Sequence, residues 1–402
     1  MSLCRIIIKK GREKSLLRRH PWVFSGAVEK ICGNPVSGDT VDLFSHDGKF
    51  LARAAYSEKS QLTARCWSFN EFEDIDRSFF RRRMQRAKAL RAAENLLDVE
   101  GGCRLVYSES DGLPGVVIDR FGEWAVAQFL SAGAEKYRDI ISETALEVFG
   151  LRGIYERSDT SVRAREGLAE RKGDVAGDIL PDEIVVRENG LFFSVDPRHG
   201  QKTGFYFDLR DVRKLAAHYA PGRRVLNAFS FTGGFACAAL KAGAEHVLNI
   251  DSSKPALARA EQNIRLNVEH PSFENRATDC FEELKRLVST GEKFDFIILD
   301  PPKLVESRNS LERGCRAYQF LARMGYKLLN PGGVMFNLSC SGLMDMPLFQ
   351  KITCDAALEA EQDALIIDTL RQSSDHPVLL TVPETFYLKG LVTTTNCDSR
   401  SE

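Results

Sequence analysis

A cysteine at the end of an apolar strand, in Ser339-Cys340-Ser341-Gly342, is the residue best suited to covalent chemistry on a nucleobase. C5 of a pyrimidine is too weak a nucleophile to attack a methyl sulfonium unaided. A thiolate that adds to C6 converts the ring into an enamine whose C5 can attack. A lone cysteine after an apolar strand is more often a small buried hydrophobe. The flanking serines and glycine, and the lowered pKa that helix N-termini and Lys303 can provide, favour a catalytic Cys340.

A second constellation, Asp300-Pro301-Pro302-Lys303, follows another apolar run. Two prolines remove two N–H donors and fix the backbone, which leaves their carbonyl groups free to accept from an exocyclic amino group. Asp300 can stay charged near a sulfonium or hydrogen-bond a ring nitrogen. Lys303 cannot stack on a base, as the aromatic residue of amino-methylating enzymes does. The alternative is a tight strand exit without a ligand.

The turn after Val225–Phe229 predicts a nucleoside site, because strand, small polar turn and helix follow one another. The Gly-x-Gly-x-x-Gly fingerprint of dinucleotide enzymes and the Lys-[Ser/Thr] ending of a Walker A loop are both absent. A cofactor with one nucleoside and no pyrophosphate fits better, and S-adenosylmethionine is the candidate. The alternative is a βαβ unit without a ligand. The expected cofactor-binding residues are Phe229, Ser230, Thr232, Gly233, Asp251, Ser252, Asp279, Cys280, Asp300 and Pro301.

These residues follow successive strands of one expected α/β sheet. The expected strands are 225–229, 246–250, about 274–277, 294–299, 333–338, 363–368 and 386–393, with helices between them. This alternation predicts a mostly parallel sheet with helices on both faces. Ligands bind at the carboxyl ends of such strands. Residues after Val392 read as an unstructured addition.

The first 72 residues predict a small β-rich module with a basic N-terminal stretch. Residues 1–30 carry eight Lys or Arg against Glu13 and Glu29. Basic side chains among aromatics suit structured RNA. We expect Trp22 and Phe24 to be core residues. The expected RNA contacts there are Lys9, Lys10, Arg12, Arg18 and Arg19.

A connector helix and a middle α+β unit are expected next. The helix spans Asp76 to Asn95, and its cluster Arg81-Arg82-Arg83 is typical of a solvated face. The polar, glycine-containing stretch Glu166 to Asp178 is expected to be mobile. The expected domains are therefore 1–72, 73–190 and 191–402.

The composition describes a globular protein without a membrane helix or a signal peptide. The chain has 402 residues, 43% hydrophobic and 28% charged, with a net charge of −1. Its ten cysteines include no Cys-x-x-Cys pair, which favours a reducing cytoplasm and argues against disulfides and a metal site.

Several long strings resemble those of the bacterial ribosomal RNA large subunit methyltransferase I family, which makes 5-methylcytosine in 23S rRNA. The resemblance covers nearly the whole chain. The matching strings are Gly-Arg-Glu-Lys-Ser-Leu-Leu-Arg-Arg-His-Pro-Trp-Val-Phe-Ser-Gly-Ala-Val (11–28), Glu-Ser-Asp-Gly-Leu-Pro-Gly (109–115), Lys-Thr-Gly-Phe-Tyr-Phe-Asp (202–208), Phe-Ser-Phe-Thr-Gly-Gly-Phe (229–235), Asp-Pro-Pro-Lys (300–303), Ser-Cys-Ser-Gly-Leu-Met (339–344), Asp-His-Pro-Val (375–378) and Tyr-Leu-Lys-Gly (387–390).

The resemblance implies an N-terminal PUA RNA-binding domain, a middle α+β domain and a Rossmann-like class I methyltransferase domain. It implies that Cys340 is the nucleophile and that a loop from Thr203 to Asp208 closes over cofactor or target. Leu209 departs from the family's usual Gln, which puts a contact from that position in doubt. The expected substrate-binding residues are Pro301, Pro302, Lys303, Tyr206, Asp208, Arg210, Lys10, Arg12, Arg18 and Arg19.

These inferences combine into an S-adenosylmethionine-dependent cytosine-C5 methyltransferase of 23S rRNA or a large-subunit precursor. Its catalytic residues would be Cys340 and Asp300. Methylation of an exocyclic amine or of guanine, and an RNA-binding assembly factor with a vestigial site, stay open as alternatives. We expect no metal and no membrane partner, and we leave a homodimer open.

Overall fold

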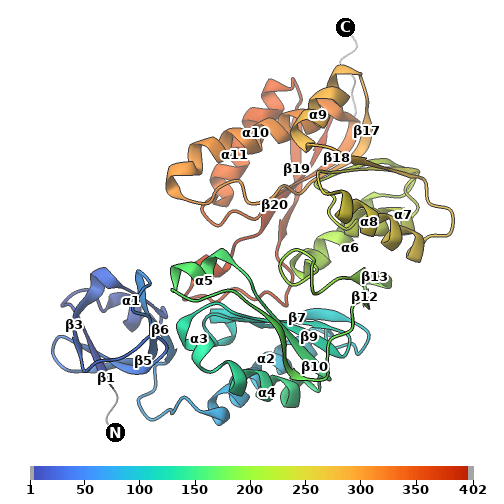
Figure 1. Ribbon diagram of the computed structural model, residues 1–402. Coiled ribbons are helices and arrows are strands. Elements are labelled where there is room, and N and C mark those ends of the chain that lie inside the picture. The colour runs from blue at the N-terminus through green and yellow to red at the C-terminus, as the bar shows by residue number, and fades with distance from the viewer. Residues whose placement is uncertain (1–3, 397–402) are drawn as a thin grey trace. The chain divides into compact units, whose positions relative to one another are not determined.

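The structure is a computed structural model that describes residues 4–396 and divides into two compact units (Figure 1). Unit 1 comprises residues up to Val186, Val195–Phe207 and Ser374–Thr385. Unit 2 comprises Arg187–Ser194, Asp208–Ser373 and the residues from Phe386 onward. Both units are therefore built from separate stretches of the chain.

The N-terminal part of unit 1 is a six-stranded β module, as expected. Its strands are β1 (Cys4–Ile8), β2 (Trp22–Phe24), β3 (Val28–Cys32), β4 (Thr40–Ser45), β5 (Phe50–Tyr56) and β6 (Leu62–Ser68), in the order β2-β6-β5-β4-β1-β3. Short helix α1 (Lys14–Leu17) and a 3-10 turn (Ser25–Ala27) complete it. The inward faces of these strands bury alternating residues such as Val41 and Leu43 in a core of the module's own.

Helix α2 (Arg77–Ala93) is the expected connector. Asp76 caps it, because its carboxylate accepts a hydrogen bond from the backbone N–H of Phe79 at 2.8 Å. Its arginine cluster is neutralised within unit 1. Arg81 pairs with Glu147, and Arg82 and Arg83 both pair with Glu73. The cluster therefore has the structural role that the sequence favoured.

The middle part of unit 1 is a five-stranded sheet with helices. Its strands are β7 (Gly102–Tyr107), β8 (Val116–Phe121), β9 (Trp124–Phe129), β10 (Gly153–Ser158) and β11 (Arg171–Gly177), in the order β11-β10-β9-β8-β7. Its helices are α3 (Ala132–Lys136), α4 (Arg138–Phe149) and α5 (Ser161–Arg165), with a 3-10 turn at Ser108–Asp111. The expectation of a mobile stretch from Glu166 to Asp178 is wrong. β11 lies within it and pairs antiparallel with β10, so tertiary pairing outweighs the low strand propensity of this polar sequence.

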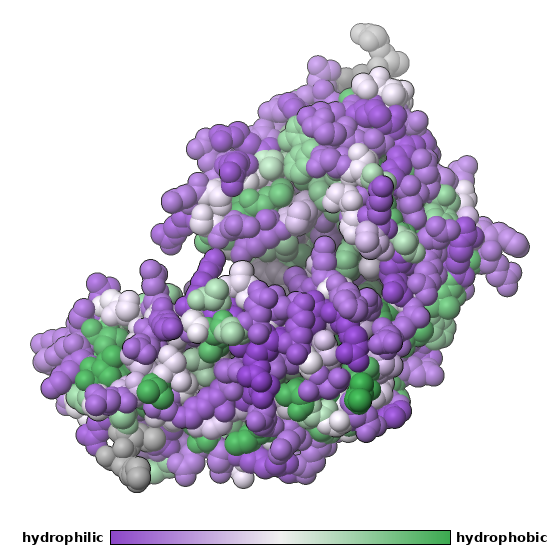
Figure 2. Space-filling view, in the orientation of Figure 1, coloured by the Kyte–Doolittle hydropathy of each residue, from purple (hydrophilic) through white to green (hydrophobic). Residues whose placement is uncertain are grey.

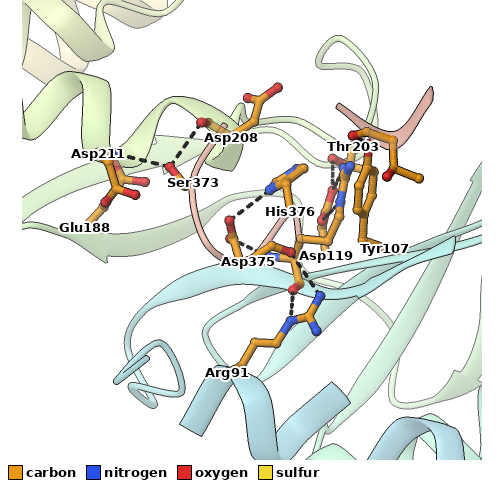
Figure 3. A network of polar contacts seen from close by, with 12 residues as sticks. Arg91, Tyr107, Asp119, Glu188, Thr203, Asp208, Asp211, Ser373, Asp375 and His376 are labelled. Atoms are coloured by element: carbon orange, nitrogen blue, oxygen red, sulfur yellow. Dashed lines mark hydrogen bonds and ion pairs between the residues drawn. The ribbon is translucent and has the colours of Figure 1, made fainter. Parts of the chain in front are cut away.

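A segment from the C-terminal third of the chain, Ser374–Thr385, is held in unit 1 by a buried polar network (Figure 3). Arg91 donates to both carboxylate oxygens of Asp111 at 2.7 Å and to the carbonyl oxygen of Asp375 at 2.9 Å. The Asp375 carboxylate accepts from the backbone N–H of Arg104 at 2.9 Å and contacts His376 Nδ1 at 2.8 Å. Arg91 and Asp375 are fully buried, so this part of the network is desolvated.

Strands β12 (Ile184–Glu188) and β13 (Leu191–Val195) form a two-stranded sheet where the chain passes from unit 1 to unit 2. Unit 2 is then a seven-stranded sheet with two helix layers (Figure 1). Its strands are β14 (Arg224–Ala228), β15 (His246–Asp251), β16 (Phe273–Ala277), β17 (Phe294–Leu299), β18 (Leu329–Ser339), β19 (Ala364–Arg371) and β20 (Lys389–Thr395). Its helices are α6 (Arg210–Tyr219), α7 (Gly234–Lys241), α8 (Lys254–Asn267), α9 (Cys280–Ser289), α10 (Leu311–Leu328) and α11 (Met346–Glu359).

The sheet order is β16-β15-β14-β17-β18-β20-β19, with β20 antiparallel to both of its neighbours. Helices α6 to α8 pack with one another on one face, and α9 to α11 on the other. This is the expected Rossmann-like α/β fold. The order runs outward in both directions from β14, so the ends of β14 and β17 flank the point where ligands bind in such sheets.

The expectation of an unstructured tail after Val392 is wrong as far as Thr395. β20 continues to that residue because its backbone pairs with β18 on one side and β19 on the other. The rest of the expected tail, from residue 397, lies outside the described residues. None of the helices in the described part combines the length and apolar character that crossing a bilayer requires. Hydrophilic side chains cover most of the face seen in Figure 2.

Candidate active site

The turn between β14 and α7 has an unusual backbone. Phe229, Phe231 and Gly233 all have positive φ angles, of 61°, 47° and 78°. Two phenylalanines in this region are strained, and such strain is found at functional sites. The Asp251 carboxylate holds the turn in place: Oδ2 accepts from the backbone N–H of Phe231 and Oδ1 from that of Ser253, both at 2.8 Å. The acid at the end of β15 therefore shapes the nucleoside turn as well as facing it.

The turn offers groups that fit a nucleoside ligand. Ser230 is buried, and its hydroxyl oxygen has no hydrogen-bond partner among the described residues. A buried hydroxyl without a partner is costly, so this oxygen is available for a bound polar group. Gly233 is packed so tightly that a Cβ there would lie 2.8 Å from Ala260 Cβ. Thr232 is partly buried, and its carbonyl oxygen accepts from Asn263 at 3.0 Å.

Three further expected cofactor residues lie at the ends of β15 and β16. Ser252 and Asp279 are exposed. Asp279 caps α9 by accepting from the backbone N–H of Glu282 at 3.0 Å. The Cys280 thiol is buried and donates to the Ile250 carbonyl oxygen at 3.5 Å. Burial raises the pKa of Cys280 to about 12, so this thiol is a structural neighbour of the turn and not a nucleophile.

The two constellations that suggested base chemistry lie side by side at the ends of β17 and β18. These strands are parallel neighbours, with Leu299 opposite Asn337. Cys340 Sγ lies 4.0 Å from the carbonyl oxygen of Pro301 and is partly exposed. Asp300 is also partly exposed, and its backbone nitrogen lies 3.5 Å from the Ala228 carbonyl oxygen at the end of β14. The Cys340 thiol, the Pro301 carbonyl group and Asp300 therefore share one edge of the sheet with the turn after β14.

The residues that follow Asp300 and Cys340 differ in their burial and in their contacts. Pro302 and Lys303 are exposed, whereas Pro301 is buried. Ser341 is fully buried and its hydroxyl oxygen accepts from the backbone N–H of Val305 at 3.2 Å and pairs with the Tyr318 hydroxyl at 2.9 Å. The serine after the cysteine therefore joins the loop after β18 to the loop after β17.

Lysine 389 is a residue of this site that sequence reasoning did not single out. It is the first residue of β20, is 2% exposed, and donates from Nζ to the carbonyl oxygens of Ser341 at 2.8 Å and Tyr387 at 2.7 Å. The sequence offered only a weak signal, a lysine that directly follows Tyr387 and Leu388 and precedes Gly390, because lysine near the start of a strand usually lies in solvent.

Asp208 and Arg210 also belong to unit 2. The Asp208 carboxylate contacts the Tyr387 hydroxyl. The carbonyl oxygen of Asp208 accepts from the Ser373 backbone at 2.9 Å and from the Ser373 hydroxyl at 3.0 Å, and Figure 3 shows these two residues together. Arg210 is buried at the start of α6. Both residues are therefore held within the protein's own packing, and their contact with substrate remains a prediction.

The other expected substrate residues belong to unit 1. Tyr206 is partly buried and donates to Gln201 Oε1 at 2.9 Å. Lys10, Arg12, Arg18 and Arg19 are all exposed on the N-terminal module. Arg12 lines a pocket of about 290 Å³ that also contains Trp22 and Phe24.

The expectation that Phe24 is a core residue is wrong, because its side chain is 54% exposed. Trp22 is only partly buried, and its indole N–H donates to Glu109 Oε1 at 2.9 Å. Short strand β2 lies at the sheet edge, so its side chains reach the surface beside the basic residues.

Comparisons with known proteins agree with this arrangement. Residues 172–361 match the family model of S-adenosylmethionine-dependent methyltransferases, and residues 6–69 match that of PUA-like domains. Ribosomal RNA large subunit methyltransferase I of Aeromonas hydrophila is 49% identical, over 96% of this chain and 98% of the relative. The protein of the same name from Yersinia pseudotuberculosis is 48% identical over the same shares. The chain belongs to this family. It is an S-adenosylmethionine-dependent methyltransferase.

Solved structures show the same fold along the whole chain. A protein from Streptococcus mutans described as a SAM-dependent methyltransferase is 23% identical, with a TM-score of 0.83 over 98% of this chain and all of that one. SMU.776, a methyltransferase solved with S-adenosylhomocysteine, gives a TM-score of 0.84 at 22% identity over the same shares. The three-domain fold, with PUA-like, α+β and Rossmann-like parts, is thereby confirmed, whereas the domain limits 1–72, 73–190 and 191–402 remain a prediction.

Proposed function

We propose that this enzyme methylates C5 of a specific cytidine in 23S rRNA through a transient covalent bond between Cys340 Sγ and C6. The observation that carries the proposal is the distance of 4.0 Å between Cys340 Sγ and the Pro301 carbonyl oxygen. The thiol that would attack C6 and the carbonyl group that would accept from N4 therefore lie next to each other at the same edge of the sheet. The relatives from Aeromonas hydrophila and Yersinia pseudotuberculosis are named ribosomal RNA large subunit methyltransferase I, which supports rRNA as the substrate.

In this proposal the chain's own residues orient the base and activate it. The target cytidine must leave its stack, because the thiolate attacks C6 from above or below the plane of the ring and a stacked neighbour would block that face. The Pro301 carbonyl accepts from the N4 amino group, and Asp300 steadies the ring near N3. The Cys340 thiolate then forms a bond to C6, and the electron pair displaced from the C5–C6 double bond makes C5 nucleophilic.

The cofactor residues fit S-adenosylmethionine, which when bound supplies its sulfonium methyl group to C5. Ser230, Asp251 and the turn to Gly233 would hold its nucleoside, with Thr232, Ser252, Asp279 and Cys280 around them. After methylation a base removes the proton from C5, the double bond re-forms and Cys340 leaves C6. Asp300 and a water molecule are both candidates for that base.

RNA docking is assigned to the exposed basic residues of the N-terminal module. Lys10, Arg12, Arg18 and Arg19 would neutralise phosphates. The other residues proposed to contact the substrate are Pro302, Lys303, Tyr206, Asp208 and Arg210. Binding of this kind weakens as salt concentration rises. The proposed rRNA substrate and the sequence without any Cys-x-x-Cys pair both favour an enzyme of the reducing cytoplasm.

Trapping of the covalent intermediate tests the proposal. RNA that carries 5-fluorocytidine should form a stable adduct with the wild-type enzyme, and mass spectrometry should place it on Cys340. Cys340→Ala should form no adduct and no 5-methylcytidine while still binding S-adenosylmethionine. Cys354→Ala, which changes an exposed cysteine of α11, is the matched control and should behave as wild type.

Other outcomes would identify another function. A methylated exocyclic amine or guanine in the nucleoside digest, with Cys340→Ala fully active, would replace the C5 mechanism. Binding of rRNA without binding of S-adenosylmethionine would favour an assembly factor with a vestigial site.

A further inference from the structure

Lys389 is buried without an ion-pair partner among the described residues. Its ammonium group has three protons, and two of them are donated to the carbonyl oxygens of Ser341 and Tyr387. Neutral carbonyls compensate only part of the cost of removing an ammonium group from water. Burial accordingly lowers the pKa of Lys389 to about 8, while the charges of Cys340 and Asp345 act in the opposite direction. A buried cation that is held this way is a mark of a functional site.

The position of Lys389 is fixed by the sheet. β20 pairs antiparallel with β18, and Lys389 lies directly opposite Ser339, the residue before the cysteine. Its ammonium group binds the carbonyl oxygen of Ser341, the residue after the cysteine. The lysine therefore spans the backbone on both sides of Cys340.

Cys340 has an electrostatic need for a nearby cation. Its Sγ lies 4.0 Å from the Pro301 carbonyl oxygen, whose partial negative charge disfavours a thiolate. Asp345, whose charge acts on Lys389, is exposed and caps α11 by accepting from the backbone N–H of Leu348 at 2.8 Å. Tyr318 is buried, which raises its pKa, so it stays neutral beside the site. The Lys389 ammonium group and a Cys340 thiolate attract each other, so the charge of Lys389 favours ionisation of the thiol.

We propose that Lys389 is a positioning residue for Cys340, which keeps the thiol ionised with its ammonium charge and fixes the loop after β18 with its two hydrogen bonds. This inference rests on the proposed function in one respect, which is that methylation of C5 requires Cys340 as a thiolate. Through Tyr387, which bonds both Lys389 Nζ and the Asp208 carboxylate, the same lysine is also tied to the end of the loop that the resemblance expects to close.

Peptide-resolved alkylation of the full-length protein tests the charge directly. The rate of iodoacetamide labelling at Cys340 is measured by mass spectrometry between pH 5 and 10, with exposed Cys354 as an internal reference. In the wild type we expect Cys340 to ionise below the ordinary thiol value of about 8.5. A pKa of Cys340 at or above about 8.5 in the wild-type protein would by itself overturn the proposal.

Substitutions then separate charge from hydrogen bonding. Lys389→Gln keeps a donor and removes the charge, and should raise the pKa of Cys340 by at least one unit, which lowers the thiolate fraction at pH 7 about tenfold. Lys389→Arg keeps the positive charge and should therefore change the pKa of Cys340 less than Lys389→Gln does. Lys285→Gln removes an exposed lysine of α9 that pairs with Glu282, and serves as the control.

The methylation rate gives a readout that a merely structural role would not move. If Lys389 acts through the thiolate, the rate of Lys389→Gln should approach that of wild type as pH rises, with an unchanged Kd for S-adenosylmethionine. An unaltered Cys340 titration in Lys389→Gln would overturn the proposal. Failure of the C5 mechanism itself would appear separately, as full methylation by Cys340→Ala.

Discussion

Gly233 is the position where a single added methyl group should damage the cofactor turn most selectively. Its φ of 78° lies in the left-handed region, where a residue with a Cβ costs roughly 1–2 kcal/mol. In Gly233→Ala the new Cβ would also lie 2.8 Å from Ala260 Cβ and 3.1 Å from Ala260 Cα. Overpacking of this kind costs roughly 1–3 kcal/mol. The two contributions together amount to about 2–5 kcal/mol.

If the turn keeps its position, this strain lowers the free energy of unfolding. If the turn shifts, the strain is relieved but the binding of S-adenosylmethionine becomes weaker. If the turn moves out of place, about 2 kcal/mol corresponds to a roughly thirtyfold weaker Kd for S-adenosylmethionine. Isothermal titration calorimetry measures the Kd, and urea denaturation measures the free energy of unfolding. We expect the sum of the two losses to lie in the range above.

Two further variants separate the causes. Gly291→Ala has a similar φ of 71° but open space around the new Cβ, so it should lose only the backbone contribution and leave the Kd unchanged. The double variant Gly233→Ala/Ala260→Gly removes the methyl group that the new Cβ would contact. Its total loss of stability and affinity should therefore be smaller than the sum of the losses of the two single variants. The reasoning is refuted if Gly233→Ala binds S-adenosylmethionine as wild type does and loses no more stability than Gly291→Ala.

Three other predictions concern burial and charge. Arg91→Met leaves the Asp111 carboxylate buried without its ion-pair partner, so unfolding in urea should show a loss of roughly 3–5 kcal/mol; a loss below about 1 kcal/mol would contradict the buried Arg91–Asp111 pair. At pH 8 the Cys280 thiol should resist alkylation because burial raises its pKa to about 12, and early labelling there would show that the turn opens. The double variant Arg12→Ala/Arg18→Ala should weaken rRNA binding and reduce the slope of log K against log salt by roughly 0.7–0.9 for each phosphate that is no longer neutralised. An unchanged slope would show that these two arginines do not contact the phosphates of the RNA.

The strands and strand-end residues of unit 2 were predictable because each of the central parallel strands is a short apolar run. Hydrophobic runs between helical patterns mark these strands, and polar residues mark where they end. Asp251, Asp300 and Cys340 could therefore be assigned to one edge of the sheet from the sequence alone. The second role of Asp251, as acceptor for two backbone N–H groups, depends on turn geometry that the spacing does not contain.

Local composition misled where pairing with distant strands decides the structure. The stretch around β11 is rich in charged residues and glycine, and it becomes a strand only because β10 offers it a partner. Phe24 reads as a core aromatic, but β2 is a short edge strand whose side chain there remains exposed. In both cases the information lies in the neighbouring strand and not in the segment itself.

Lys389 shows the same principle within the active site. In the sequence it stands 48 positions from Ser341, the residue whose carbonyl it binds, and a lysine near the start of a strand usually points to solvent. Because β20 inserts antiparallel between β18 and β19, no face of its first residue is left at an edge, and the side chain is buried beside the cysteine loop. A strand order in which β19 lay next to β18 would separate lysine and cysteine. The antiparallel return of the last strand is therefore what supplies the cation that a thiolate at the end of β18 requires.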